Sequence, residues 1–221
     1  MRTSILIEKE GKCIVIDIGP DFRQQMLRAK VEKLDAIIIT HEHNDHVAGL
    51  DDVRPFNFKF WKDMPVYATD RVQDQLKTRF SYAFSENPYP GSPMIQLHTI
   101  NKRQEFVAAD ISILPIEVMH GSLPVLGFRV ADFVYLTDVK TISPEEKLKA
   151  KNAKVLVLSA LHRKEHHSHL NLNQAIELIK ELSPEKAYLI HLSHQMGLHE
   201  EVSDLLPENV AIAYDGLKLT I

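Results

Sequence analysis

The chain has 221 residues, a formal net charge of −4 and an ordinary apolar content of 44%. This length fits one α/β domain, and no apolar run approaches the roughly 18 residues that a membrane helix needs. Acids and bases are interspersed, which argues against a general nucleic-acid surface but leaves a local basic patch open.

The lone cysteine, Cys13, excludes an internal disulfide and suits a reducing cytoplasm. The N-terminus MRTSILIEKEG lacks the basic, apolar and small-residue pattern of a secretion signal. We therefore expect a cytoplasmic protein.

Short apolar runs rich in Val and Ile predict buried strands. In chain order they are 4–8, 13–18, 35–40, 66–69, 111–119, 127–131, 133–137, 154–159, 186–190, 210–214 and 217–221. Helices are predicted at 21–30, 70–80, 144–150, 172–182 and 197–206. No repeat or linker divides the chain, so we expect a single α/β domain over 1–221, with packed sheets and helices outside them.

The segment THEHNDHVAGLDD (40–52) follows a predicted strand and carries metal-type ligands. His41, His43 and Asp45 are two residues apart and point to the same side in an extended segment. His46 comes next, at the start of a short helix. Imidazole and carboxylate are ligands for Zn, Mn or Fe(II). A polar loop is the alternative, but three His and one Asp in six residues favour a metal site.

Other predicted strands also end in a candidate ligand. His120 follows 111–119, Asp138 follows 133–137, and His191 follows 186–190. Taken alone, each also fits a hydrogen-bonded loop residue or a helix cap. Strand ends on one rim of a sheet can converge, and the complete set contains enough ligands for two metal ions.

These residues resemble the metallo-β-lactamase superfamily, whose signature is HxHxDH followed by spaced His, Asp and His. The branch of cyclic phosphate phosphodiesterases, near the tRNA 3′-processing endonucleases, looks similar in several segments. They are DIGPDFR (17–23), GLDDVRPFN (49–57), MHGSLPVLGFRV (119–130), YLTD (135–138), HLNLNQAIELI (169–179) and HLSHQMGLHEE (191–201). The resemblance implies a four-layer αββα sandwich. Relatives usually begin with a Gly-rich first strand and often a Cys-rich zinc segment, whereas this sequence begins at MRTSILIE. Either the first strand is missing from this sequence or the protein dispenses with it, and one cysteine cannot build a structural zinc site.

The resemblance also assigns the ligands of two divalent ions, Zn or Mn, with Fe also suited. His41, His43 and His120 bind the first, Asp45, His46 and His191 bind the second, and Asp138 bridges both. Related β-lactam hydrolases often carry Cys in place of Asp138, so this carboxylate favours phosphodiester hydrolysis.

Three further residues have two interpretations each. Asp17 lies beneath the metal histidines by resemblance, or is a turn residue before Gly-Pro. Arg54 pairs with a substrate phosphate or is a solvated surface residue. His194 supports the metal site or is a loop residue.

The segment LHRKEHHSHLN (161–171) holds four histidines. By resemblance His169 is a catalytic residue, and it precedes a helix capped by Asn171 or Asn173. The positive helix end disfavours imidazolium, whereas a bound phosphodiester favours it. The anion is expected to be closer, so His169 is the candidate general acid. His162, His166 and His167 are interpreted as exposed or structural.

We therefore expect a metal-dependent phosphodiesterase acting on a small or cyclic phosphodiester. A hydroxide held by the metals attacks phosphorus, Asp45 belongs to the catalytic set, and His169 protonates the leaving alkoxide. The alternatives are a tRNA 3′-end endonuclease, a thioester hydrolase and, least favoured, a non-catalytic metal-binding protein. No long basic arm for tRNA is visible. The resemblance to this family is the sole basis for expecting a homodimer.

Overall fold

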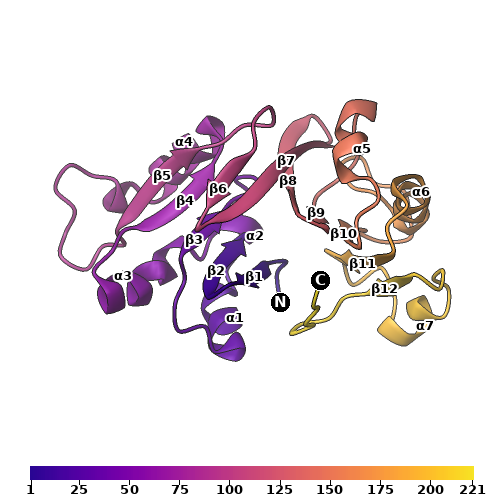
Figure 1. Ribbon diagram of the computed structural model, residues 1–221, viewed down its shortest axis with the longest axis horizontal. Helices are drawn as coiled ribbons and strands as arrows, with labels where there is room; N and C mark the ends of the chain where they lie inside the picture. Colours follow the sequence, from indigo (N-terminus) through magenta and orange to yellow (C-terminus); the bar gives the residue numbers. More distant parts are fainter. The chain divides into compact units, whose positions relative to one another are not determined.

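The computed structural model describes all residues, 1–221, as two compact units, Met1–Ile111 and Ser112–Ile221. Figure 1 draws the first unit from indigo to magenta, and the second from there through orange to yellow. Each unit has an apolar core of its own, and the single domain over 1–221 stays a prediction. No helix has the length and apolar character needed to cross a membrane.

The first unit is built on a five-stranded sheet in the order β1-β2-β3-β4-β5. The strands are β1 (Ile5–Lys9), β2 (Lys12–Ile16), β3 (Ala36–Ile38), β4 (Met64–Ala68) and β5 (Ile95–Thr99). β1 and β2 are antiparallel, and β2 to β5 are parallel. The carboxyl ends of β2 and β3 therefore lie at the same edge of the sheet.

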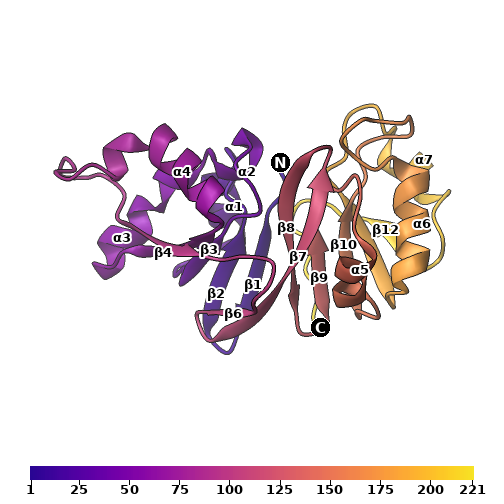
Figure 2. The same ribbon diagram turned by 90° about the horizontal axis from the view of Figure 1, so that it is seen from above.

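Helices cover one face of this sheet (Figure 2). They are α1 (Phe22–Ala29), the short α2 (Asn44–Val47), α3 (Arg54–Phe60) and α4 (Asp70–Arg79), with 3-10 turns at Leu50–Val53 and Ser81–Ala83. Phe22 of α1 and Leu76 of α4 are fully buried in one cluster with Val15, Ile37 and Val66 of the sheet. This core fixes the loops that follow β2 and β3. A further short strand, β6 (Phe106–Ala108), follows β5 in the chain.

The second unit continues with six strands in the order β12-β11-β10-β9-β8-β7. They are β7 (Ile111–His120), β8 (Leu123–Val130), β9 (Phe133–Leu136), β10 (Val155–Ser159), β11 (Lys186–Ile190) and β12 (Val210–Ile212). β7, β8 and β9 are antiparallel neighbours, whereas β9 to β12 are parallel. β7 therefore runs in the direction of β9, and the carboxyl ends of β7, β9, β10 and β11 share one edge.

Three helices pack against this sheet: α5 (Pro144–Ala150), α6 (Leu172–Leu182) and α7 (His199–Ser203). α6 begins with a capping box, in which Asn171 accepts a hydrogen bond from the backbone of Gln174 at 2.9 Å and the Gln174 side chain accepts one in return. Asn171, one of the two predicted caps, therefore fixes the end of the loop that carries His169.

Most predicted elements occur, with shifted ends, but one predicted strand is absent and some observed elements were not predicted. Residues 217–221 form no strand, since Leu217 lies in a turn that donates to Tyr214 and Leu219 is exposed. β5, β6 and α3 were not predicted. β5 has only partly buried side chains, and α3 carries a proline in its first turn and aromatic residues in place of strong helix formers.

Candidate metal centre

The first group of candidate ligands follows the ends of β2 and β3. Asp17 comes directly after β2, has a left-handed backbone (φ 63°) and is completely buried. Its carboxylate accepts hydrogen bonds from the backbone N–H of Thr40 at 2.9 Å and from the Thr40 hydroxyl. Nδ1 of His46 lies 2.7 Å from the same carboxylate. A metal would therefore be bound by His46 through the other nitrogen, Nε2.

The histidine rings of this segment lie against one another. Nε2 of His41 and Nδ1 of His43 are 3.0 Å apart, and the ring centroids of His41 and His46 are 4.2 Å apart. Nδ1 of His41 lies 2.9 Å from the hydroxyl of Thr40, so Nε2 of His41 is the nitrogen directed toward the His43 ring. An Asp45 carboxylate oxygen is 3.6 Å from Nε2 of His46. Imidazoles and a carboxylate that converge in this way suit a divalent transition metal.

Helix α4 holds the backbone that carries these ligands. Glu42, between His41 and His43, pairs with Arg71 at 2.6 Å, and Arg79 donates to the carbonyl oxygen of Glu42 at 2.6 Å. These contacts were not predicted from the sequence, because they join residues about thirty positions apart without a local pattern.

Two glycines allow a close backbone approach at the same place. A Cβ on Gly19 would collide with the carbonyl oxygen of Asp45, and one on Gly49 would collide with the carbonyl oxygen of Gly19. The backbone N–H of Ile18 donates to the carbonyl of His46, and that of Gly49 donates to the carbonyl of Ile18, both at 2.8 Å. The loops after β2 and β3 are thus packed backbone to backbone.

The second group of candidate ligands lies at the edge of the second sheet. Asp138 follows β9, has φ 55° and is 2% exposed. Its Oδ2 accepts from the Thr137 hydroxyl at 2.7 Å, and its Oδ1 lies 3.4 Å from Nε2 of His191. Nδ1 of His120 is 2.8 Å from the carbonyl oxygen of Ser168, so a metal would be bound through Nε2.

His169 belongs to this second group by position. Donor atoms of His120, Asp138 and His169 all lie within 4.8 Å of one another. The ring centroid of His169 is 4.4 Å from that of His120 and 5.3 Å from that of His191. Burial lowers the pKa of His169 to about 4, against the opposing effect of Asp138. Without a bound anion, His169 is therefore neutral at pH 7.

The other three histidines of the cluster differ in exposure. His162 is buried, His166 is half-buried and His167 is exposed. The ring of His166 lies between those of His162 and His169, with centroid distances of 5.6 Å and 5.2 Å.

Arg54 and His194 have different surroundings from the ligands. Nε of Arg54 donates to the carbonyl oxygen of Asp51, and its guanidinium pairs with the Asp51 carboxylate, which also accepts from Tyr82 at 2.5 Å. The planar fork of Arg54 is thus already engaged by its own turn. His194 is exposed on the loop after β11.

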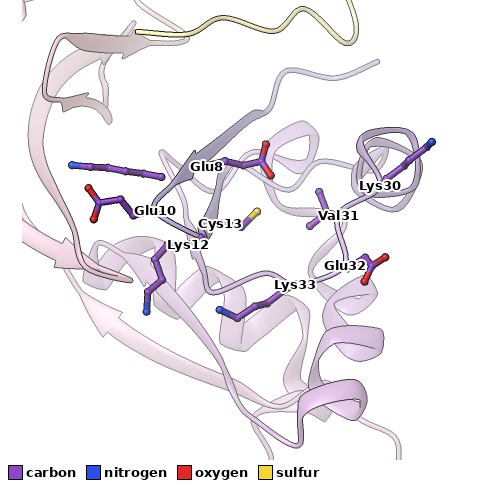
Figure 3. Close-up of a pocket in the computed structure, with 10 residues that line it drawn as sticks. Glu8, Glu10, Lys12, Cys13, Lys30, Val31, Glu32 and Lys33 are labelled. Atoms are coloured by element: carbon purple, nitrogen blue, oxygen red, sulfur yellow. The ribbon is translucent and has the colours of Figure 1, made fainter.

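A hollow of about 540 Å³ lies elsewhere on the first unit, at the amino ends of β2 and β3 (Figure 3). Charged side chains of both signs line it, and Lys12 pairs with Asp110 at 2.8 Å. Burial raises the pKa of the Cys13 thiol to about 11, so this thiol is protonated and unreactive at pH 7. The hollow is separate from the candidate ligands.

Residues 12–192 match the Beta-lactamase superfamily domain, which is most of the chain. The chain belongs to the beta-lactamase superfamily. The superfamily predicted from the HxHxDH segment is thus confirmed, as is the α/β fold class with two sheets and helices.

A solved structure of this superfamily, a new diphosphatase from the PhnP family, is 33% identical to the chain. It has a TM-score of 0.92, covering 99% of this chain and 83% of that one. The short form of human tRNase Z, 17% identical, has the same fold with a TM-score of 0.74 over 100% of this chain and 92% of that one. Solved neighbours of this fold thus include a diphosphatase and a tRNase Z.

Curated relatives match over part of their length. An octanoyltransferase of Porphyromonas gingivalis is 43% identical over 222 residues, which is 100% of this chain but 45% of the relative. A ribonuclease Z of Macrococcus caseolyticus is 28% identical over 121 residues, 52% of this chain and 38% of the relative. The chain thus spans less than half the length of these curated relatives. The activity for which a whole relative is named therefore does not by itself apply to the segment that matches this chain.

Proposed function

We propose that this chain hydrolyses small or cyclic phosphodiesters with two divalent metal ions, Zn or Mn, with Fe also suited. The proposed ligands are His41, His43, Asp45, His46, His120, Asp138 and His191. The observation that carries the proposal is Asp138, a buried carboxylate directed at both His191 and His169. The similarity to a PhnP-family diphosphatase supports phosphorus as the reacting centre.

The protein's own residues have distinct tasks in this proposal. When bound, the ions supply an activated water and offset the charge of the phosphoryl group. Asp17 orients His46 through the 2.7 Å contact with its Nδ1, and the carbonyl of Ser168 orients His120. Such outer partners fix the tautomer of a ligand and typically change metal affinity or activity 10–100-fold, roughly, when removed.

His169 is the proposed general acid. Its Nδ1 is buried without a hydrogen-bond partner, which leaves this N–H to interact with a substrate oxygen. Because its pKa is low in the free chain, protonation depends on the negative charge of the bound phosphodiester, which raises it. His169 would then give its proton to the departing alkoxide.

The rival activities remain distinguishable. A tRNA 3′-end endonuclease is supported by the ribonuclease Z relatives, but the net charge of −4 does not favour tRNA. A thioester hydrolase is an alternative for which the octanoyltransferase relative suggests an octanoyl substrate. A non-catalytic metal-binding protein is the least favoured, and a homodimer is proposed from the family alone.

The test is a substrate panel with Mn or Zn added to the purified full chain. We expect turnover of bis(p-nitrophenyl) phosphate and of cyclic phosphates, and no turnover of an octanoyl thioester. His120→Ala should abolish turnover, whereas His167→Ala, at an exposed position, should leave it unchanged. Activity on the thioester or pre-tRNA alone would refute the proposal, and less than one metal per chain would favour the non-catalytic protein.

A further inference from the structure

A second hollow on the first unit, of about 360 Å³, lies between α3 and the loop that leads into β5 (Figure 1). Phe58 of α3 and Tyr89 of the loop line it, together with three prolines. Met94 and Ile95 also line it, which places it at the amino end of β5. Because β2 to β5 are parallel, the hollow and the first group of candidate ligands lie at opposite edges of the sheet.

The walls of this hollow are tied together by Asn57, a fully buried residue of α3. Its side-chain amide donates to the carbonyl oxygens of Lys62 at 2.8 Å and of Met94 at 2.9 Å, and its Oδ1 accepts from the N–H of Met94 at 3.1 Å. The ring of Tyr89 stacks on that of Tyr82, with 6.1 Å between the centroids. The hollow is therefore held in shape before a ligand arrives, which lowers the entropy cost of binding.

One lining residue, Ser92, has a hydroxyl that the protein leaves without a hydrogen-bond partner. Ser92 is 6% exposed. An unpartnered buried hydroxyl is costly, and a rotation about one bond redirects it. Asp63 also lines the hollow and is exposed, so its charge disfavours a second carboxylate. Such a hollow suits a neutral ligand with an apolar chain and one hydrogen-bond acceptor.

The volume of the hollow limits the length of that chain. A methylene group takes up about as much space as a water molecule, roughly 30 Å³. An octanoyl thioester, with its carbonyl oxygen and sulfur, then takes up roughly 300 Å³, whereas a twelve-carbon thioester takes up roughly 420 Å³. The first fits within about 360 Å³ and the second does not. The octanoyltransferase relative, 43% identical over 222 residues, supports the octanoyl length.

We propose that this hollow binds an octanoyl chain presented as a neutral thioester. The chain lies against Phe58 and Tyr89, and the carbonyl oxygen accepts a hydrogen bond from the Ser92 hydroxyl. The site lies away from the first group of candidate ligands and binds the acyl group without cleaving it. It therefore does not depend on the proposed phosphodiester hydrolysis.

The single tryptophan, Trp61, reports on binding because its ring centroid is 6.2 Å from that of Phe58. The chelator-treated full chain is titrated with S-acyl-N-acetylcysteamine thioesters of four, eight and twelve carbons, and the fluorescence of Trp61 gives Kd. We expect Kd to fall about tenfold or more from four to eight carbons, because each buried methylene tightens binding by up to about fourfold. Twelve carbons should bring no further gain. Equal Kd values, or a steady gain through twelve carbons, would overturn the proposed fit.

Octanoate separates the thioester from a free fatty acid as the ligand. Its carboxylate meets the charge of Asp63, so we expect a Kd about tenfold higher than that of the octanoyl thioester. Asp63→Asn should narrow this difference. If octanoate binds the unaltered chain as tightly as the thioester does, the assignment to a neutral thioester is wrong.

Two variants in the hollow and one outside it test the named contacts. Ser92→Ala should raise Kd for the octanoyl thioester about fivefold while leaving Tm unchanged or higher, because it removes an unpartnered buried hydroxyl. Tyr89→Ala removes an apolar wall and should also raise Kd. Tyr214→Ala, at a 62% exposed aromatic of the second unit, is the matched control and should not. An unchanged Kd in both hollow variants, or an equal rise in Tyr214→Ala, rejects the site.

Hydrolysis is measured separately in the same variants. Turnover of bis(p-nitrophenyl) phosphate by metal-loaded Ser92→Ala should equal that of the unaltered chain. A loss of turnover together with acyl binding would contradict a separate site. If the unaltered chain binds the octanoyl thioester but cleaves no phosphodiester, the proposed function fails and the acyl site stands.

Discussion

At the scale of single residues, His169 has the most specific task. Its neighbours place it next to the proposed ligands His120 and His191, yet burial keeps its imidazole neutral in the free chain. A neutral imidazole cannot protonate a leaving group, so its function requires the anionic substrate. An alkoxide needs that proton, because the pKa of an alcohol is far above 7, whereas nitrophenolate leaves almost without help.

This difference gives a measurement for the proposed role. We expect His169→Ala to lower kcat about a hundredfold or more for alkyl phosphodiesters and much less for p-nitrophenyl esters. His167→Ala, in the same loop, is the matched control and should leave both rates unchanged. Equal losses on both leaving groups would exclude His169 as the general acid.

At the scale of elements, the ligands depend on how closely two loops pack. Gly19, after β2, lies against the carbonyl oxygen of Asp45, and α4 holds Glu42 through Arg71 and Arg79. A single methyl group at Gly19 must therefore displace the backbone of a proposed ligand. We expect Gly19→Ala to lower the free energy of unfolding by about 2 kcal/mol and to reduce the metal content.

The control for this change lies in the turn between β1 and β2. A Cβ on Gly11 (φ 75°) would meet no atom within 4 Å, and asparagine tolerates a left-handed backbone. Gly11→Asn should keep both the metal content and the free energy of unfolding. The free energy of unfolding is measured by circular dichroism melts, and the metal content by metal analysis, for both variants. Full metal content in Gly19→Ala would contradict the proposed dependence of metal binding on this close packing.

Much of this element-level picture was predictable from the sequence, and some of it was not. The proposed ligands follow buried apolar strands in a local pattern, so His41, His43 and Asp45 could be proposed from their spacing alone. Asn171 was identified because capping is local. The contacts of Glu42 with α4 depend on tertiary packing, which single-sequence patterns do not carry. The alternating segment 217–221 looks like a strand but pairs with no strand of either sheet.

At the scale of the whole molecule, each unit has its own apolar core, and each carries part of the proposed ligand set. A metal that binds only the folded chain stabilises it by mass action. We expect chelation to lower Tm by roughly 5–10 °C, if the free metal had been near 100 times its Kd. Readdition of Mn or Zn should restore Tm, and His191→Ala should show a smaller shift. An unchanged Tm would speak against metal binding by the folded chain.

The backbone at Asp17, Asp138 and His191 has a consequence for the evolution of this chain. All three are non-glycine residues with φ between 55° and 63°, and each closely follows a strand. Asp and His tolerate left-handed backbone better than most residues, and Gly has no steric cost there. A relative that no longer uses these side chains can therefore carry Gly at the same strand ends without a backbone penalty. Gly at all three positions would mark a relative that has lost these proposed metal-site residues.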